Sequence, residues 1–399
     1  MVGGRAGRDE WTATRSSATR AGQSARSREV IPAASGRSAV PARALHVAVV
    51  GVGLIGGSIG LAARERLGAT VTGYDPDERV GAAALRRGAV AAAADSVHAA
   101  VRGADLVFVA APVGMLAGAI DEVLAAAPED CAVSDVGSTK RSIVGGRRDP
   151  RFIGGHPLAG AETAGVEHAR ADLFDGATWY LVPGPETSDP LYERLHRALV
   201  GIGAQPAAIE ADAHDRVMAS VSHLPHVFAN VLVGAAARSL GDGEDVPATG
   251  PSFRDATRVA GASSTIWPDI YLSNRDALVP LIDEAQQRLA EVRGALARGD
   301  RAEIERWNDA ARADREALLG AGLVGGAVHE LRASVTDRPG AVAEIALALG
   351  RASINIADMA LSPSRDGSQG VIALWVRGEE QAQRAEGLIA ALGIPVARP

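Results

Sequence analysis

Residues 45–58, LHVAVVGVGLIGGS, decide the fold of this 399-residue chain. The run begins as a buried strand, breaks into three glycines spaced G-x-G-x-x-G, and continues as an apolar helix. In such a turn Gly51 permits the sharp bend, Gly53 lets the backbone approach a pyrophosphate, and Gly56 lets the helix lie close to the strand. The helix N-terminus adds unpaired N–H groups and a partial positive charge. We therefore predict a dinucleotide site that includes Gly51, Gly53, Leu54, Ile55 and Gly56.

An acidic residue at the end of the next strand indicates which dinucleotide binds. The segment Thr70–Asp75 ends in a carboxylate at about the 20-residue offset of a ribose partner. Asp75 would accept hydrogen bonds from both ribose hydroxyls and repel a 2′-phosphate, which favours NAD over NADP. Asp75 also suits the first position of a turn because Pro76 follows it, and the two roles are compatible.

Strand and helix patterns alternate as far as residue 209. We expect strands at 105–111, 131–135, 151–154, 179–183 and 205–209, and helices at 77–87, 114–126, from Ser138, and at 190–201. This alternation predicts an α/β Rossmann domain over residues 44–209, built on a doubly wound parallel sheet. Ligands gather at the carboxyl ends of such strands, so Ala111 and Pro112 are predicted to contact the cofactor.

Two further domains are expected. Residues 210–320 read as an all-α domain with helices at 212–240, 255–259, 275–297 and 301–319. The last two of these helices are long and carry apolar stripes. This pattern predicts that they pack against other helices and form a homodimer. Glycines between residues 320 and 326 form a linker. Residues 327–399 follow the order βαββαβ, which predicts an α+β ferredoxin-like domain.

The composition restricts the classes of function. With 47% hydrophobic and 22% charged residues and no apolar run of about 18, the chain is expected to be soluble, cytoplasmic and free of membrane spans. Cys131 is the one cysteine, which excludes an intrachain disulfide and a cysteine-based zinc site; no metal site is expected. Residues 1–43 hold eight Arg against three acidic residues and predict a disordered tail. The remaining chain is acidic, which argues against nucleic acid as a partner.

Three polar residues follow the expected strand ends. His156 precedes Pro157 at the end of a strand, and its ordinary pKa near 6.5 suits a general base; a hydrogen-bonded loop histidine is the alternative. Ser138 could cap a helix, or its hydroxyl could orient His156 or the nicotinamide. Lys140 is the one lysine among 41 basic residues. Its compact ammonium could attract an anionic substrate or order the loop. The alternative is that a lysine at this position is a matter of chance.

A proline interrupts the long helix expected after residue 212. Pro225, within the sequence SHLPH, removes one backbone hydrogen bond, so the helix should kink or open there. At helical spacing Asp215, Ser222 and His226 share one face, whereas His223 points elsewhere. Such a polar stripe needs partners, which a bound substrate or a second subunit could supply.

Arginines follow at helical spacing. Arg254 and Arg258 lie at i and i+4, with Asp255 one turn before Arg258. Held by Asp255, Arg258 would present a planar fork to a carboxylate. The alternative is a surface ion pair that contributes little.

Taken together, several motifs resemble the prephenate/arogenate dehydrogenases of tyrosine biosynthesis. These motifs are GVGLIGGS at 51–58, DVGSTK at 135–140, GHPLAGAE at 155–162, SHLPH at 222–226 and DATR at 255–258. The resemblance covers residues 45–320. The segment from Val328, with DRPG at 337–340 and INI at 354–356, resembles an ACT domain, a regulatory amino-acid-binding module.

This resemblance implies a reaction and roles for the site residues. Hydride would leave C4 of a cyclohexadienol for NAD while CO2 leaves C1, and the ring becomes aromatic. His156 would take the proton of the C4 hydroxyl, and Ser138 would orient His156. The implied substrate contacts are Arg258 with the ring carboxylate, Ser222 and His226 in the pocket, and Glu162 near its mouth. Ala161 stands where many relatives have a hydroxyl residue, so this chain lacks that hydroxyl beside Glu162.

The substrate and the class of function each have alternatives. His226, as a cation or hydrogen-bond donor, suits the extra carboxylate of prephenate, so prephenate is preferred to arogenate. An aromatic amino acid is the expected effector of the ACT domain. The chain could instead be an NAD-binding, amino-acid-responsive regulator, against which His156, Ser138 and Arg258 argue. A hydroxy-acid dehydrogenase of the 6-phosphogluconate-like group would need a lysine base in the helical domain, which has none.

Overall fold

The computed structural model describes residues 44–160, 163–239, 251–261, 266–320, 328–336, 338–363 and 369–398. All of these residues belong to the second of the two units into which the chain divides, Ala44–Pro399. The predicted tail, the break near residues 241–243 and the glycine linker lie outside the described residues, as does Glu162.

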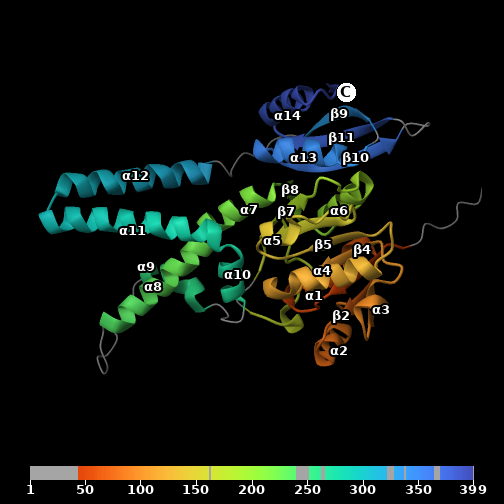
Figure 1. Cartoon of the computed structure of the whole chain (residues 1–399), viewed down its shortest axis with the longest axis horizontal. Helices are drawn as coiled ribbons and strands as arrows, with labels where there is room; N and C mark the ends of the chain where they lie inside the picture. Colours follow the sequence, from red (N-terminus) through yellow and green to blue (C-terminus); the bar gives the residue numbers. More distant parts are fainter. Residues whose placement is uncertain are drawn as a thin grey trace, which may run out of the picture. The chain divides into compact units, whose positions relative to one another are not determined.

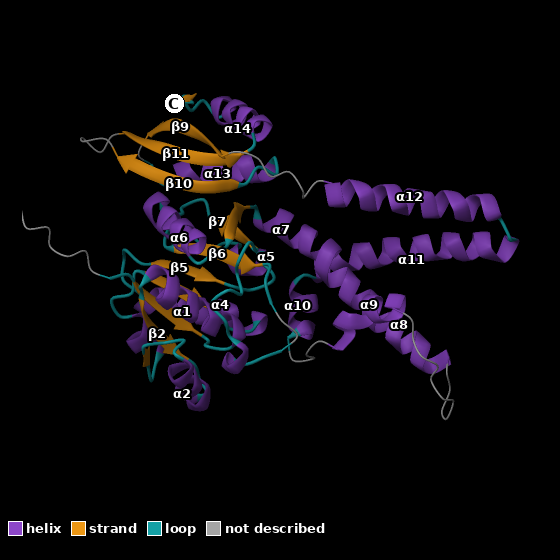
Figure 2. Cartoon of the chain, turned by 180° about the vertical axis from the view of Figure 1, so that it is seen from behind, coloured by secondary structure: helices purple, strands orange, loops and turns teal. Residues whose placement is uncertain are grey.

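An eight-stranded sheet forms the first domain (Figures 1 and 2), with the order β3-β2-β1-β4-β5-β6-β7-β8. The strands are β1 His46–Val50, β2 Thr70–Tyr74, β3 Ala92–Ala93, β4 Leu106–Val109, β5 Ala132–Asp135, β6 Phe152–Pro157, β7 Thr178–Pro183 and β8 Gln205–Ala208. All neighbours are parallel except β6 and β7. The Rossmann prediction is confirmed, but this antiparallel pair was not expected. Residues 158–177 form no crossover helix, and antiparallel strands need none.

Helices connect these strands, largely where the periodicity predicts them. They are α1 Leu54–Leu67, α2 Glu78–Arg87, α3 Val97–Val101, α4 Val113–Ala126, α5 Arg141–Val144 and α6 Asp189–Gly201. The short elements β3 and α3 were not predicted, because an alanine-rich segment gives no clear period. The inner strands β1, β4 and β5 are almost wholly buried, as their continuous apolar sequences require.

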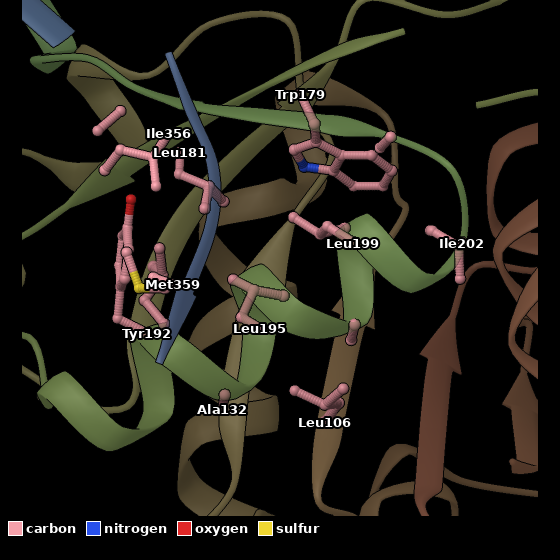
Figure 3. Close-up of a cluster of buried hydrophobic side chains, with 14 of the residues drawn as sticks. Leu106, Ala132, Trp179, Leu181, Tyr192, Leu195, Leu199, Ile202, Ile356 and Met359 are labelled. Carbon is pink, nitrogen blue, oxygen red and sulfur yellow. The ribbon is translucent and has the colours of Figure 1, made fainter. Parts of the chain in front are cut away.

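Helix α6 joins two cores. On one side Leu195 and Leu199 lie toward Leu106 and Trp179 of the large sheet (Figure 3). Toward the other side, Tyr192 lies near the strand that carries Met359. That strand belongs to the C-terminal domain, whose strand β10 packs on α6. The two domains therefore share one continuous apolar cluster within the second unit.

The C-terminal domain is a four-stranded antiparallel sheet with two helices. Its strands are β9 Val328–Thr336, β10 Ile356–Pro363, β11 Gln369–Arg377 and β12 Val396–Ala397, in the order β10-β11-β9-β12. Its helices are α13 Ala341–Arg351 and α14 Glu379–Ala391. The predicted βαββαβ order is confirmed.

The middle of the chain is helical. Its α-helices are α7 Ala211–Met218, α8 Leu224–Ser239, α9 Pro251–Thr257, α10 Trp267–Ser273, α11 Arg275–Arg298 and α12 Arg301–Gly320. A π-helical turn over Ala219–His223 joins α7 to α8 just before Pro225, which confirms the predicted opening. Helix α10 was not predicted.

The continuous helix Ala211–Ser239 is long and apolar enough to cross a membrane, judged by length and composition alone. The sequence expectation counted uninterrupted apolar runs, whereas this test averages hydropathy over an 18-residue window. Only 28% of its most apolar window is buried in the chain. Its exposed large apolar side chains include Val221, Phe228, Val231, Leu232 and Val233.

Candidate active site

The glycine turn has the backbone geometry that its sequence predicts. Gly51 adopts a φ of +91°, in the left-handed region that favours glycine, and its N–H donates to Tyr74 O at 2.8 Å. A Cβ on Gly56 would lie 1.9 Å from Gly51 O, so only glycine lets α1 start this close to β1. A Cβ on Gly53 would meet nothing within 4 Å. The turn thus presents open space at the N-terminus of α1, as a bound pyrophosphate requires.

Neighbouring residues complete this edge of the sheet. Asp75 follows β2, and its Oδ2 accepts a hydrogen bond from Val52 N at 3.1 Å, inside the glycine turn. Its Oδ1 accepts one from Asp77 N at 3.1 Å, so the carboxylate also forms the expected turn. Ala111 and Pro112 lie between β4 and α4, directly after the segment that contacts Gly51. These groups surround the place where a nucleotide would lie on the turn.

His156 lies in β6 and is held by a second histidine. Its Nδ1 is 2.8 Å from His214 Nε2, and the two rings meet edge to face at 5.1 Å. Burial, with smaller contributions from His214, Lys140 and His223, holds the pKa of His156 well below 6.5. The imidazole is therefore neutral at pH 7, as a general base must be.

His214 was not predicted to belong to the site. It lies in α7, and its Nδ1 is 2.8 Å from Asp215 Oδ1. Asp215 also accepts the backbone N–H groups of Lys140 and Arg141 at 2.8 and 2.9 Å. Burial alone would raise the pKa of Asp215, but hydrogen bonds from His214, Arg141 and Lys140 hold it below its ordinary value. In the sequence, the adjacent pair His214-Asp215 was the one local sign of this role. The contact of His214 with His156 joins residues that are 58 positions apart.

The ammonium of Lys140 is held within the chain, which supports the loop-ordering alternative over the predicted contact with substrate. Its side chain is fully buried, and Nζ donates to Asp135 Oδ2 and Gly137 O at 2.7 Å and to Thr139 O at 3.0 Å. Since an ammonium has three protons, none remains for a ligand. Burial lowers the pKa of Lys140 and the Asp135 carboxylate opposes this. Lys140 instead orders the loop after β5, the alternative role.

Ser138 belongs to that loop and is not a helix cap. Helix α5 begins at Arg141, and its N-cap position is Lys140. The Ser138 hydroxyl is buried and has no hydrogen-bond partner among the described residues. It therefore does not orient His156 here, because His214 does so. A buried hydroxyl without a partner costs free energy, so Ser138 is suited to meet a ligand.

His226 forms a separate aromatic cluster. Its ring stacks on Trp267 with centroids 3.5 Å apart and an interplanar angle of 9°. Its Nδ1 is hydrogen-bonded to the Tyr271 hydroxyl and lies 3.3 Å from Asn230 Nδ2. Its Nε2 is buried and makes no hydrogen bond of good geometry among the described residues, although the ring also interacts with the backbone of Val259. Burial lowers its pKa, so a neutral donor replaces the cationic alternative.

The π turn changes which residues share a face. His223, not Ser222, lies with Asp215, because Asn274 Nδ2 donates to Asp215 O at 2.8 Å and lies 3.1 Å from His223 Nδ1. Ser222 is half-buried and His223 is buried. The predicted stripe assumed 3.6 residues per turn, and a wider turn rotates everything after it.

Arg258 begins the 3-10 turn Arg258–Gly261, which packs on α8, the helix that carries His226. The guanidinium is exposed, as is Asp255 one turn earlier. Its expected role in binding the ring carboxylate remains a prediction.

The first domain is a Rossmann domain that carries a glycine turn, an acidic residue at a strand end and a buried neutral histidine, and a helical domain follows it. These features define a class of dinucleotide-dependent dehydrogenase. Residues 59–207 match the family described as prephenate dehydrogenase, nucleotide-binding domain, and residues 210–308 match its dimerization domain. Residues 329–388 match the ACT domain. The chain belongs to the prephenate dehydrogenase family.

Individual relatives agree with this assignment. The chain is 31% identical over 356 residues to prephenate dehydrogenase of Bacillus subtilis, covering 86% of this chain and 95% of that protein. It is 34% identical over 270 residues to cyclohexadienyl dehydrogenase of Zymomonas mobilis, covering 64% and 89%. Prephenate dehydrogenase from A. aeolicus, solved with hydroxyphenyl propionate and NAD+, matches with a TM-score of 0.63 and 26% identity, over 69% of this chain and 98% of that chain.

Proposed function

We propose that the chain catalyses the NAD-dependent oxidative decarboxylation of prephenate to 4-hydroxyphenylpyruvate, CO2 and NADH, a step of tyrosine biosynthesis in the cytoplasm. The observation that carries this proposal is the neutral His156 on β6, hydrogen-bonded at Nδ1 in a domain that also carries the glycine turn. Family membership supports the same reaction.

NAD fits the residues at the turn. The open space at Gly53 admits a phosphate, and the N–H groups at the start of α1 can donate to it. The Asp75 carboxylate, at the end of β2, can accept from the ribose hydroxyls and opposes a 2′-phosphate. Bound NAD supplies the acceptor for the hydride that leaves the substrate.

The proposed role of His156 is to move one proton. Its Nε2 takes the proton of the C4 hydroxyl while the C4–H bond breaks and the hydride departs. The C1 carboxylate then leaves as CO2, and its bonding electron pair enters the ring, which becomes aromatic. His156 returns the proton to the phenolic oxygen, so no net proton is released. Aromatisation supplies driving force, and the protein supplies position and one base.

The proposed substrate contacts divide by charge. The Nε2–H of His226 and the guanidinium of Arg258 would bind carboxylates, and the Ser138 hydroxyl would meet the substrate or the nicotinamide. Ser222 and Glu162 remain predictions from the motif resemblance.

Parallel assays with prephenate and arogenate, each with NAD and NADP, test the proposal. NADH formation from prephenate with NAD is the expected result. Faster turnover of arogenate would assign the alternative substrate, and activity with neither would leave the regulator hypothesis. Arogenate is a real competitor, since arogenate dehydrogenase of Synechocystis matches with a TM-score of 0.59 and 25% identity, over 69% of this chain and all of that chain.

We also propose a homodimer through the helical domain. Helices α8, α11 and α12 leave Phe228, Leu289 and Trp307 exposed, and these residues line an apolar pocket of about 330 Å³. A second copy would bury them, along with the exposed face of the long apolar helix. Light scattering should give twice the mass of one chain.

The ACT domain is the proposed site of an aromatic amino-acid effector. A cavity of about 860 Å³ lies between the loop at Arg338–Gly340 and the catalytic domain. Charges of both signs line it, including the ion pair of Arg351 with Glu210. Asn355 Oδ1, elsewhere in this domain, is buried and has no hydrogen-bond partner among the residues that the structure describes. A zwitterion suits such a cavity, and tyrosine, phenylalanine and tryptophan should be compared by their effects on rate and melting temperature.

A further inference from the structure

His156, His214 and Asp215 form a chain of hydrogen bonds in which His214 and Asp215 are buried and His156 is half-buried. His156 Nδ1 lies 2.8 Å from His214 Nε2, and His214 Nδ1 lies 2.8 Å from Asp215 Oδ1. We propose that His214 and Asp215 are positioning residues that keep His156 in the tautomer with an unprotonated Nε2. The inference rests on the proposed function, in which that nitrogen is the base.

The tautomers follow from counting protons. The Asp215 carboxylate can only accept, so the proton between it and His214 belongs to His214 Nδ1. Burial lowers the pKa of His214, so the ring is neutral and carries no second proton. Its Nε2 is therefore an acceptor, and His156 Nδ1 must donate to it. A neutral His156 with its proton on Nδ1 has a lone pair on Nε2.

The chain of hydrogen bonds is anchored at its far end. Asp215 accepts the N–H groups of Lys140 and Arg141, at the start of α5. Asn274, at the junction of α10 and α11, donates to the Asp215 carbonyl at 2.8 Å. Two segments, the start of α5 and the junction of α10 and α11, thus fix Asp215 independently of any ligand. A fixed Asp215 fixes the His214 ring, which in turn fixes His156.

This arrangement also stabilises the protonated base. When His156 Nε2 takes the hydroxyl proton, the ring becomes a cation that still donates from Nδ1 to His214. The Asp215 carboxylate lies one ring further and offsets the new charge without taking a proton itself. Removing His214 therefore takes away the acceptor at Nδ1 and releases the tautomer of His156.

A purely structural role for His214 is the competing explanation. His214 is completely buried, and Tyr180 of β7 packs edge to face on it with centroids 5.6 Å apart. The titratable or charged groups around His156 come from several elements, namely His214 and Asp215 on α7, Lys140 and Asp135 near β5, His223 in the π turn, and Tyr180 on β7. A test must separate loss of packing from loss of the acceptor.

Two substitutions of His214 make that separation. His214→Leu fills the space and removes the acceptor, whereas the amide oxygen of His214→Gln can still accept from His156. We expect kcat to fall at least ~10-fold in His214→Leu with unchanged KM for prephenate and NAD. The acid limb of kcat/KM should shift in His214→Leu, and His214→Gln should recover part of kcat because it restores the acceptor at Nδ1. His46→Leu is the matched control, a half-buried histidine bonded to Gly103 O and Thr72 Oγ1, and should keep full kcat.

A measurement without turnover keeps the inference separate from the proposed function. In protein labelled with 15N-histidine, and assigned through His156→Asn, the His156 Nε2 resonance should be that of an unprotonated nitrogen. In His214→Leu it should shift toward a protonated nitrogen. A protonated Nε2 in the original chain, or unchanged kcat in His214→Leu, would overturn the inference. If the fall in kcat of His214→Leu equals its loss of folded protein and its pH profile is unchanged, the role of His214 is structural. Wild-type inactivity would refute the function alone.

Discussion

His156 and His226 are two neutral histidines that offer opposite chemistry. His156 donates from Nδ1 to His214 and so presents a lone pair at Nε2. Asn230 donates toward Nδ1 of His226, so that ring carries its proton on Nε2, which is buried and makes no hydrogen bond of good geometry within the described part of the chain. Burial lowers the pKa of both rings. The pKa alone therefore does not assign a role, because the hydrogen bond at the other ring nitrogen decides between base and donor.

The surroundings reinforce this difference. The acceptor that holds His156 is backed by the Asp215 carboxylate, which favours a positive charge appearing on that ring. His226 instead stacks on Trp267 and is hydrogen-bonded to the Tyr271 hydroxyl, with no carboxylate among its described hydrogen bonds. One ring is prepared to gain a proton during the reaction, and the other to keep the proton that it has.

Removal of the base should have the largest effect. His156→Asn keeps a polar side chain of similar reach but cannot carry a proton at neutral pH. We expect turnover to fall at least ~10²-fold with a modest change in KM, because general acid–base catalysis contributes about that much or more. Steady-state kinetics with prephenate measures both constants. Unchanged turnover would exclude His156 from the mechanism.

Removal of the donor should have a smaller and different effect. His226→Leu deletes the Nε2–H, so KM for prephenate should rise about 10-fold while kcat changes little, as expected for one hydrogen bond to a charged group. His226→Gln, whose amide can donate from a similar position, should restore part of the affinity. A fall in kcat without a rise in KM would give His226 a role in the chemical step and remove the contrast with His156.

The same comparison separates what the sequence predicts from what it does not. The glycine turn was predictable because its constraint is local. Gly51 needs a positive φ, and Gly56 lies so close to Gly51 O that a Cβ would not fit. His156 could be found because a strand end and Pro157 mark its place. His214 could not, since its partner lies 58 residues earlier and only the folded chain brings them together.

Two errors have physical causes of the same kind. The prediction that Ser222 shares a helical face with Asp215 was wrong because a π turn shifts the helical register. Periodicity assumes a constant number of residues per turn. Lys140 was correctly singled out as unusual, but its unusual feature is a buried ion pair with Asp135, a contact within the chain and not with a substrate. A residue type that occurs once in a chain is a candidate for a specific role, but its rarity does not show whether that role is structural or functional.

The smallest effect should be a loss of stability in acid. Burial lowers the pKa of His156, His214 and His226, and that of His223 to about 4, all below the 6.5 of an unfolded chain. The unfolded state then binds more protons below pH 6.5, so the stabilisation is present above that pH and is lost as pH falls. Asp189, whose pKa burial raises to about 6, acts in the opposite direction but is one group against four.

Melting temperatures measured between pH 7.5 and 4.5 check this expectation. They should fall by several degrees below pH 6.5, and His223→Leu should reduce the decline between pH 6.5 and 4 because its proton-binding difference is gone. His223 makes its described hydrogen bond to Asn274 and none to His156, so the variant should keep most of the turnover at pH 7.5. A melting temperature that rises on acidification would mean that Asp189 outweighs the histidines. It would also remove the premise that both His156 and His226 are neutral because they are buried.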